Sequence, residues 1–359
     1  MKATAQRAIA LLQELIATPS HTREEQATAE ILARHLSEAG VVVERIEQNI
    51  IARSRGFDPA RPTLALNSHH DTVRPAASYT RDPYAPTLEG GRLYGLGAND
   101  AGASLVALVE LFIALYDKAL PFNLLLALSA EEECGGEKGA RAWVPAVGKV
   151  DMAIVGEPTS MQAALAERGL VVLDCEAQGV SGHAAREEGI NALYIALEDI
   201  ARLRDYRFER ESKFLGPIRI TTTQIAAGTQ HNVVPDKCRF VVDIRTTDAY
   251  TNEETVELLR KELRSTITPR STRIRASVIE ESHPLVRAAV KAGAATFISP
   301  TTSDRTLMPF PALKIGPGDS SRSHTADEYV LLTEIEEGID TYLKIIENLA
   351  TEYGYQTVG

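Results

Sequence analysis

The sequence has few cysteines, and none of them stand at paired spacing. Among 359 residues there are three, Cys134, Cys175 and Cys238. This pattern argues against a disulfide framework and against a zinc site built from thiolates. We therefore expect each cysteine to be a small buried hydrophobic residue, and we expect the chain to reside in a reducing cytoplasm.

Long basic runs are also missing, and acidic residues outnumber basic ones. There are 38 Lys and Arg against 49 Asp and Glu, which gives a formal net charge of −11. A protein whose main task is to bind the phosphate backbone usually shows the opposite balance, so nucleic acid is not expected as a partner. The first twenty residues lack a sustained apolar core with a cleavage site and predict an amphipathic helix instead. No membrane partner is expected.

What the chain does contain, in its first and last parts, is an alternation of short apolar runs with longer amphipathic stretches. Residues 63–68, 122–129 and 151–157 predict strands, and 101–119 and 137–147 predict helices. Continuous apolar runs such as "LLLAL" are typical of strands buried on both faces of a mainly parallel sheet covered by helices. The pattern returns with a helix at 283–294, a strand at 312–316 and a helix at 333–353.

The middle of the chain has a different pattern. From about Gly169 to Glu281 the runs "LVVLDCEAQGV", "IRITTTQI", "KCRFVVDIRTT" and "RIRASVIE" alternate apolar and polar residues, as half-buried antiparallel strands do, with helices expected at 191–205 and 252–267. The predicted fold is therefore an α/β domain with a mainly parallel sheet, made of residues 1–168 and 282–359, into which an α+β domain of residues 169–281 is inserted.

Candidate chemistry first appears at the end of the first predicted buried strand, in "TLALNSHHDTV". Because side chains alternate faces in an extended chain, His69 and Asp71 can point the same way while His70 points the opposite way. A carboxylate that accepts the second ring N–H of a histidine is the usual support of a metal-bound imidazole. The alternative is a hydrogen-bonded pair at a strand end without a metal.

Further polar groups follow the later strands. Asp100 stands between a glycine-rich turn and a helix start, where a helix cap is the alternative role. The run Glu131, Glu132 and Glu133 follows an apolar strand, where like charges repel unless a cation or proton compensates them, the alternative being a solvated acidic turn. Glu157 and His324 follow two more predicted strands.

Five successive strand ends thus deliver His, Asp, Glu, Glu and His to what we expect to be one edge of one sheet. Imidazoles and carboxylates without thiolates favour zinc or a similar divalent ion in an open catalytic site. One bridging carboxylate with two ligands for each ion would hold two ions about 3.5–4 Å apart.

The motifs "SHHDTV", "GLGANDAG", "SAEEE", "VGEPT", "GVSGHAA", "HNVVPD" and "GPG…SHTADE" occur in this order along nearly the whole chain. In order and spacing they resemble the di-zinc metallopeptidase family that includes acetylornithine deacetylase, succinyl-diaminopimelate desuccinylase, and related carboxypeptidases and aminoacylases. Within that family the resemblance is greatest to the acetylornithine deacetylase branch.

The resemblance implies a role for each matching position. His69 and Glu157 would bind one zinc ion, Glu133 and His324 the other, and Asp100 would bridge them. It further implies that Asp71 orients His69, that Glu132 is the general base, and that Glu131 fills a commonly acidic flanking position. In the inserted domain, His183 would reach the partner subunit's active site and stabilise the oxyanion. Asn232 and Arg245 of the same domain would contact substrate. The implied cofactors are two zinc ions, which cobalt can replace.

Two positions depart from the family pattern G-R-G-x-x-D-x-K-G around the bridging aspartate. This chain has Leu96 and Gly102 where the family commonly has Arg and Lys. Neither position is a ligand, so the departures bear on local charge and substrate preference. His70 fills a position that is usually apolar or small, and we expect it to be a packed or hydrogen-bonded neighbour.

The resemblance implies a cytoplasmic homodimer, joined through residues of the 169–281 domain, that removes an acetyl or succinyl group from N-acyl-ornithine or N-acyl-citrulline in arginine biosynthesis. A succinyl-diaminopimelate desuccinylase, an aminoacylase or a dipeptidase of the same family is the alternative. A metal-binding or regulatory protein on a hydrolase scaffold is a second alternative, and the presence of Glu132 beside a full ligand set argues against it.

Overall fold

The chain divides into two compact units, which we name the large unit and the inserted unit. A computed structural model describes residues 2–186 and 188–354. The large unit comprises Met1–Leu165, Ile279–Phe297 and Ser303–Gly359, and the inserted unit comprises Ala166–Val278 and Ile298–Thr302. The boundaries expected from the sequence were 168/169 and 281/282.

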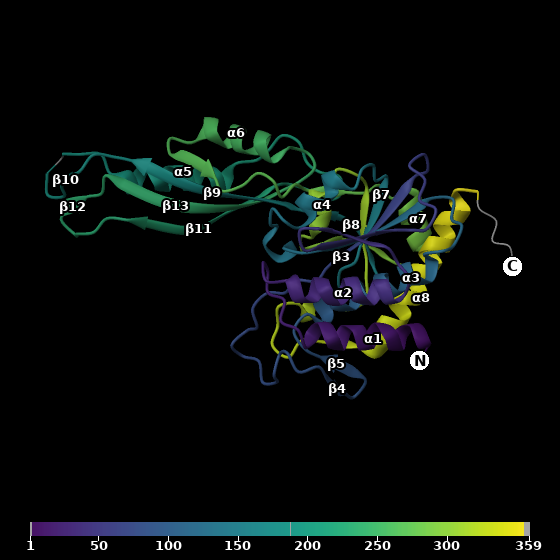
Figure 1. The fold of residues 1–359 in the computed structure, drawn as a ribbon. Helices are drawn as coiled ribbons and strands as arrows, with labels where there is room; N and C mark the ends of the chain where they lie inside the picture. Colours follow the sequence, from purple (N-terminus) through teal and green to yellow (C-terminus); the bar gives the residue numbers. More distant parts are fainter. Residues whose placement is uncertain (1, 187, 355–359) are drawn as a thin grey trace. The chain divides into compact units, whose positions relative to one another are not determined.

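The large unit is built on a mixed sheet, in which Figure 1 labels β3, β7 and β8. The strand order is β1-β2-β6-β3-β7-β17-β8. Strands β6, β3, β7 and β17 are parallel to one another. The outer pairs are antiparallel, namely β1 with β2, β2 with β6, and β17 with β8. All residues of β3 and β6 are buried, as continuous apolar runs predict for strands covered on both faces. The predicted α/β fold class is confirmed. The strand bounds are β1 Val43–Ile46, β2 Asn49–Arg53, β3 Thr63–His69, β6 Asn123–Ser129, β7 Met152–Val155, β8 Ala163–Glu167 and β17 Ala312–Lys314.

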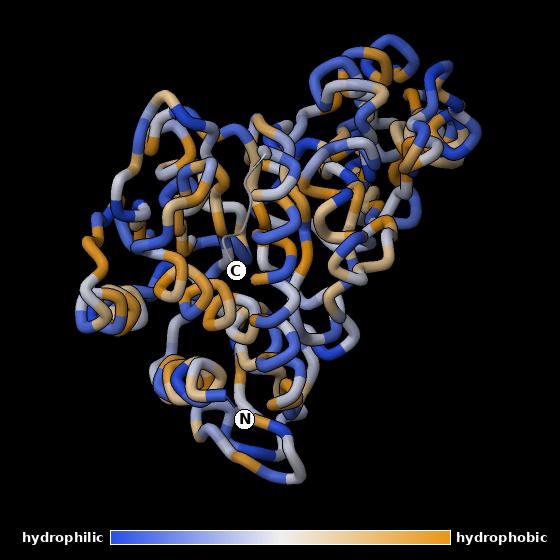
Figure 2. Tube along the Cα trace, turned by 90° about the vertical axis from the view of Figure 1, so that its right-hand side faces the viewer, coloured by the Kyte–Doolittle hydropathy of each residue, from blue (hydrophilic) through white to orange (hydrophobic). Residues whose placement is uncertain are grey.

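Helices cover both faces of this sheet. Trp143 of α4 packs on one face, in a cluster with alternate strand residues such as Ala65 and Leu125. Helix α3 contacts β3 and β6 and also packs against α1 and α8. In Figure 2 hydrophobic and hydrophilic residues alternate along much of the chain, as amphipathic elements require. The helix bounds are α1 Ala3–Ile16, α2 Gln26–Glu38, α3 Ala103–Leu115, α4 Ala140–Ala146, α7 Pro284–Lys291 and α8 Leu332–Glu352.

Helix α3 is apolar on almost every side. Among the described residues, the stretch Ala98–Leu115 is long and apolar enough to cross a membrane by length and composition, and 83% of it is buried inside the structure. A buried core helix passes the same test, so this stretch is weak evidence for a membrane span.

The large unit also contains a separate three-stranded sheet with the strand order β18-β5-β4. It consists of Thr87–Glu89 (β4), Arg92–Tyr94 (β5) and Tyr329–Leu331 (β18). The segment that carries Asp100 follows β5, so this aspartate does not follow a strand of the main sheet as the sequence suggested. The pairing of Tyr94 with Tyr329 instead brings the chain before α3 next to the chain after His324.

The inserted unit contains a four-stranded antiparallel sheet with the order β11-β13-β9-β14. Buried and exposed residues alternate along β9 and β13, as expected for half-buried strands, and α5 contacts β9, β11 and β13. A capping box between Thr251 and Glu254 begins α6. The bounds are β9 Gly169–Gln178, β11 Arg219–Ala227, β13 Lys237–Thr246, β14 Thr266–Pro269, α5 Ala192–Asp205 and α6 Asn252–Glu262.

Two sequence predictions for this unit were wrong. The helix expected at 252–267 ends at Glu262, and Thr266–Pro269 forms β14, because Thr266, Ile267 and Thr268 are β-branched and fit a pleated, half-buried surface. The strand expected at 273–280 is reduced to β15, Ser277–Val278, which pairs with Ala166–Glu167 of β8 and not with the four-stranded sheet.

The expectation that all three cysteines are buried was wrong for one of them. Cys175 and Cys238 are buried, whereas Cys134 is exposed, and all three are free. Cys134 lies in the short helical turn η2, Glu132–Cys134, beyond the end of β6. Cys134 therefore lies outside the packed strands, and it does not have the apolar environment that was expected for it.

Candidate active site

Three of the predicted ligands come from the ends of neighbouring parallel strands. His69 is the last residue of β3 and pairs in register with Ser129, the last residue of β6. Glu133 follows β6, and Glu157 follows β7, which is parallel to β3. Parallel strands end at the same edge of a sheet, so these side chains meet at its carboxyl edge, where ligands bind in open α/β sheets.

Asp100 lies between two histidines. Its Oδ1 is 3.3 Å from Nε2 of His69, and its Oδ2 is 3.6 Å from Nε2 of His324. Each oxygen of the carboxylate thus faces a different imidazole, which is the arrangement that a bridging ligand requires. The turn before it needs Gly97, whose φ is +76° and whose added Cβ would lie 2.7 Å from the Thr72 side chain.

The remaining ligands complete two groups around this carboxylate. Nε2 of His69 is 3.8 Å from Oε1 of Glu157. Nε2 of His324 is 3.1 Å from Oε2 of Glu133. Donor atoms lie within 4.8 Å of one another in two sets, of which one is His69, Glu132 and Glu157 and the other is His69, Asp100 and Glu133.

The histidines and carboxylates perturb one another strongly. Burial lowers the pKa of His69, but the carboxylates of Asp100 and Asp71 outweigh burial and leave it raised well above its ordinary value. The hydrogen bond to Glu133 raises the pKa of His324 to about 9. Without a metal ion, therefore, protons on the two imidazoles compensate the negative charge of the site.

Glu132 lies among the predicted ligands, with a carboxylate oxygen within 4.8 Å of donor atoms of His69 and Glu157. Burial raises the pKa of Glu132 well above its ordinary value, and the carboxylates of Glu157 and Asp304 add to the rise. Such a carboxylate accepts and holds a proton more readily than a solvated one, which suits a general base. Glu131 differs from it, because its Oε2 accepts a hydrogen bond from the backbone N–H of Lys138 and its own N–H binds Glu25.

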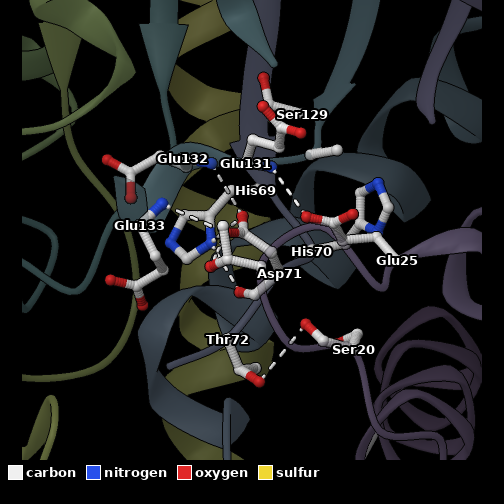
Figure 3. A network of polar contacts seen from close by, with 12 residues as sticks. Ser20, Glu25, His69, His70, Asp71, Thr72, Ser129, Glu131, Glu132 and Glu133 are labelled. Atoms are coloured by element: carbon white, nitrogen blue, oxygen red, sulfur yellow. Dashed lines mark hydrogen bonds and ion pairs between the residues drawn. The ribbon is translucent and has the colours of Figure 1, made fainter. Parts of the chain in front are cut away.

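Asp71 supports both His69 and the glutamate turn. Nδ1 of His69 lies 3.0 Å from the backbone oxygen of Asp71 and 3.4 Å from its Oδ1, so the backbone is the nearer acceptor, whereas the sequence predicted the carboxylate. The two oxygens of that carboxylate accept hydrogen bonds from the backbone N–H groups of Glu132 and Glu133 (Figure 3). Asp71 is therefore positioned to orient the predicted base as well as the ligand.

His70 points away from this cluster, as the alternation of the strand predicts. Figure 3 shows its ring on the opposite side from that of His69. Its Nδ1 lies 2.9 Å from Oγ1 of Thr28, and its Nε2 lies 3.1 Å from the backbone oxygen of Gln48. Burial lowers the pKa of His70 to about 4, so it is a neutral, hydrogen-bonded core residue near neutral pH.

The other predicted site residues belong to the inserted unit. His183 is exposed in β10, Gly182–His183, which pairs with β12, Val233–Val234. Asn232 is its neighbour, because the backbone oxygen of Asn232 accepts a hydrogen bond from Ala184. Arg245 lies on β13 and forms an ion pair with Asp243 at 2.8 Å. The roles of these residues toward substrate stay predictions.

Three carboxylates around the site were not predicted to have a role. Glu328 accepts hydrogen bonds from the backbone of Asn99 and Asp100. Glu25 accepts one from Glu131. Asp304 is buried, and burial raises its pKa to about 6. Only Glu328 had a signal in the sequence, since it ends the motif "SHTADE".

A small cavity of about 30 Å³ adjoins His69 and Asp100. Leu96 and Gly102, the two departures from the family pattern, both line it. As the backbone stands, a Cβ at position 102 would lie 2.3 Å from the backbone oxygen of Gly97. The turn before α3 is therefore folded in a way that excludes a side chain at this position.

The donor set fits divalent metal ions. It consists of imidazole nitrogens and carboxylate oxygens, which suit zinc and similar ions. Several acidic side chains here are mostly buried, including Asp100 and Glu133, whose side chains are 13% and 9% exposed. Buried like charges at this density require a compensating positive charge, and a cation between the ligand groups supplies it.

Comparisons with known proteins agree with this reading of the site. The sequence profile of peptidase family M20/M25/M40 matches residues 65–348. A succinyl-diaminopimelate desuccinylase of Delftia acidovorans is 27% identical over 384 residues, covering 96% of this chain and 98% of that protein. Another from Azoarcus sp. is 32% identical over 256 residues, covering 66% of this chain and 67% of that protein.

Solved structures share the fold. The aminopeptidase PepT of Bacillus cereus superimposes with a TM-score of 0.77 at 19% identity and covers 96% of this chain and 99% of its own. The YXEP protein of Bacillus subtilis, described as a dinuclear metal binding peptidase of the M20 family, gives a TM-score of 0.72 at 16% identity, covering 96% and 98%. The relatives named here do not support the acetylornithine deacetylase branch. The chain belongs to peptidase family M20/M25/M40 and is a metal-dependent hydrolase of linear amides.

Proposed function

We propose that this enzyme removes the succinyl group from an N-succinyl amino acid, with succinyl-diaminopimelate as its substrate and two zinc ions as its cofactor. The substrate is supported by the desuccinylases that cover nearly the whole chain or two thirds of it. N-acyl-ornithine and N-acyl-citrulline, which the sequence motifs suggested, become competing substrates in the test below. The corresponding pathway is lysine biosynthesis in place of arginine biosynthesis.

The observation that carries amide hydrolysis is the position of Asp100 between His69 and His324, with Glu132 beside them. His69, Glu157 and Asp100 would hold one ion, and Glu133, His324 and Asp100 the other. Bound zinc supplies Lewis-acid polarisation and lowers the pKa of a coordinated water toward about 7 from about 16.

The chain's own groups handle the proton and the alignment. The carboxylate of Glu132 removes a proton from the attacking water and later donates it to the nitrogen of the leaving amine. Asp71 fixes the backbone of Glu132 and Glu133 through two hydrogen bonds, so the base and a ligand keep one relative position. The products are succinate and a free amino group.

We also propose that the enzyme is a homodimer joined through the inserted unit, and that His183 acts in the partner subunit's active site. This unit carries exposed apolar side chains that a subunit contact would cover, including Tyr194 at 64% and Leu197 at 49% exposure on α5. Strand β11 is an edge strand of nine residues, available for pairing with a second chain.

A substrate panel tests the proposed activity. Purified protein supplied with zinc or cobalt is assayed side by side on succinyl-diaminopimelate and on the acetyl and succinyl derivatives of ornithine and citrulline. We expect kcat/KM to be highest for succinyl-diaminopimelate. The assignment would be overturned if an acetylated substrate, or an ornithine or citrulline derivative, had a kcat/KM at least tenfold higher than that of succinyl-diaminopimelate. A tenfold difference corresponds to about 1.4 kcal/mol in the free energy of the transition state.

The blank for this assay is E132A purified in the same way, because a host desuccinylase carried through purification would otherwise mimic activity. E132A should bind both metal ions and lose at least about 10²-fold in kcat, the scale of general acid–base catalysis. Near-normal turnover of E132A with two ions bound would show that Glu132 is not the base.

A further inference from the structure

Glu328 lies buried at the junction of two loops that carry metal ligands. It is 2% exposed and directly precedes β18. Its Oε1 accepts hydrogen bonds from the backbone N–H of Asn99 at 2.8 Å and from that of Asp100 at 2.9 Å. Its backbone oxygen accepts a third from Gly95 at 3.0 Å. One residue thus binds both ends of the 95–100 turn.

The other end of the His324 loop grips the same turn. Asn99 donates from Nδ2 to the backbone oxygen of Asp319 at 3.0 Å, and its Oδ1 accepts from the N–H of Asp319 at 2.9 Å. The 319–328 segment is therefore attached to the 95–100 turn at both of its ends. Between these attachments lies His324, whose Nε2 is 3.6 Å from Oδ2 of Asp100.

The neighbouring residue offers a matched comparison. Asp327 also accepts hydrogen bonds from two consecutive backbone N–H groups, those of Thr80 and Arg81, each at 2.9 Å. Neither Thr80 nor Arg81 is a ligand. Asp327 and Glu328 are thus adjacent carboxylates that each accept from two consecutive backbone N–H groups, although Asp327 is less buried and also accepts from the hydroxyl of Thr80. They hold different loops.

A carboxylate at position 328 is placed against a like charge. Burial and the charge of Asp100 raise the pKa of Glu328 to about 8. Burying an acidic side chain beside another one costs free energy, and the hydrogen bonds that it accepts offset part of this cost. The bonds that it makes are to the backbone of the bridging ligand and of the residue before it.

We propose that Glu328 is a positioning residue that holds the Asp100 turn and the His324 loop in the relative position from which both bind one metal ion. The proposal rests on the metal-binding roles of Asp100 and His324 under the proposed function. It assigns the effect to the acceptor oxygen Oε1, which takes both N–H groups, and not to the negative charge. Outer-shell groups of this kind typically contribute 10- to 100-fold in metal affinity.

The first test uses the metal-free full-length protein and amide hydrogen exchange. In E328A the amides of Asn99 and Asp100 should exchange at least about tenfold faster than in the wild type, because they lose their acceptor. In D327A the amides of Thr80 and Arg81 should exchange faster, while those of Asn99 and Asp100 stay as in the wild type. E328Q keeps an acceptor oxygen and should protect Asn99 and Asp100 as the wild type does.

The second test measures cobalt affinity by chelator competition and follows the visible absorption of bound cobalt. E328A should bind one of the two ions about 10- to 100-fold more weakly, with a changed spectrum, while E328Q and D327A stay within about threefold of the wild type. If E328A fails to fold, E328D is tested instead. Its side chain is one methylene shorter than that of Glu328, so E328D should show an intermediate loss of cobalt affinity.

Two results would overturn the positioning role. One is unchanged exchange at Asn99 and Asp100 together with unchanged cobalt affinity in E328A or E328D. The other is a loss in E328Q as large as in E328A, which would assign the effect to charge. A wild-type protein that binds no cobalt would overturn the proposed function. The positioning role is tested separately, by comparing the variants with a wild-type protein that does bind cobalt, so the two failures are distinguishable.

Discussion

The backbone N–H of Glu132 donates a 3.0 Å hydrogen bond to Oδ1 of Asp71. The other oxygen, Oδ2, accepts from the N–H of Glu133 at 3.2 Å and from the hydroxyl of Thr22 at 2.8 Å. Both oxygens of Asp71 are therefore acceptors for N–H groups of the turn that carries the predicted base and a ligand. The residue that supports His69 on β3 thereby also fixes the end of β6.

This relationship predicts an unusual result for the conservative variant D71N. Its amide can present only one acceptor oxygen, so its NH2 group would face a backbone N–H. We expect D71N to lose nearly as much kcat/KM as D71A, about 10- to 100-fold, the range typical of outer-shell groups. Steady-state kinetics with measured metal content checks this. T22V, which removes only the hydroxyl donor, should change kcat/KM little, and a near-normal D71N would contradict the dual role of Asp71.

Metal content should fall in pairs when ligands are removed. E133A and H324A should each retain about one ion per chain, because Glu133 and His324 lie 3.1 Å apart and would bind the same ion. His69 and Glu157 lie near each other and would bind the other ion. D100A should weaken the binding of both ions, because the two oxygens of Asp100 face different histidines. Elemental analysis after dialysis against a weak chelator measures this.

The control for metal content is E131Q, which alters the glutamate whose carboxylate accepts from the N–H of Lys138. E131Q should keep both ions. Equal loss of both ions in E133A, H324A and E157A would be incompatible with the pairing.

How much of the site was predictable depends on how each residue is held. His69, Glu133 and Glu157 were predictable because apolar runs identify parallel strands, whose ends must share one edge. Asp100 and His324 were also expected at this edge as residues that follow strands, but their roles as bridging ligand and zinc ligand came from the family resemblance, because both lie in loops without a periodic pattern. Glu328 was missed as a functional residue, since it acts on backbone groups 228 positions away in the chain.

The errors in the fold have the same origin in competition between local and distant effects. The 252–267 prediction followed the helical pattern past Glu262, but the β-branched residues from Thr266 onward pair with β9. Asp100 was expected after a strand of the main sheet, whereas β5 pairs with β18, 235 positions apart at Tyr94 and Tyr329 (329 − 94). Local patterns identify an extended segment without identifying its partner.

Acid should destabilise the metal-free protein partly through His70. Its pKa is about 4 in the folded chain against 6.5 for a free histidine, so between these values the unfolded state binds more protons and stability falls as pH falls. The shift corresponds to roughly 3 kcal/mol, present above pH 6.5 and lost toward pH 4. In H70Q the side-chain amide can still donate to the backbone oxygen of Gln48, and the side chain at position 70 no longer titrates in this range. Urea unfolding at several pH values should show a shallower decline for H70Q than for the wild type, and parallel curves would contradict this.

The role of His183 in a partner subunit is testable by mixing two inactive variants. In the inserted unit His183 is exposed, and its Nδ1 accepts a hydrogen bond from the N–H of Ala185 at 3.1 Å. In a neutral ring the other nitrogen, Nε2, therefore carries the hydrogen and is the donor. H183A should keep both metal ions and lose about 10²-fold or more in kcat, the scale of a lost oxyanion donor. After subunit exchange with E132A, a mixed dimer has one site with Glu132 from one chain and His183 from the other. Random exchange makes half of the dimers mixed, so roughly a quarter of wild-type activity should return in a twofold-symmetric dimer. If mass spectrometry verifies exchange and no activity returns, His183 does not act across subunits, and a monomer with full turnover would exclude the dimer itself.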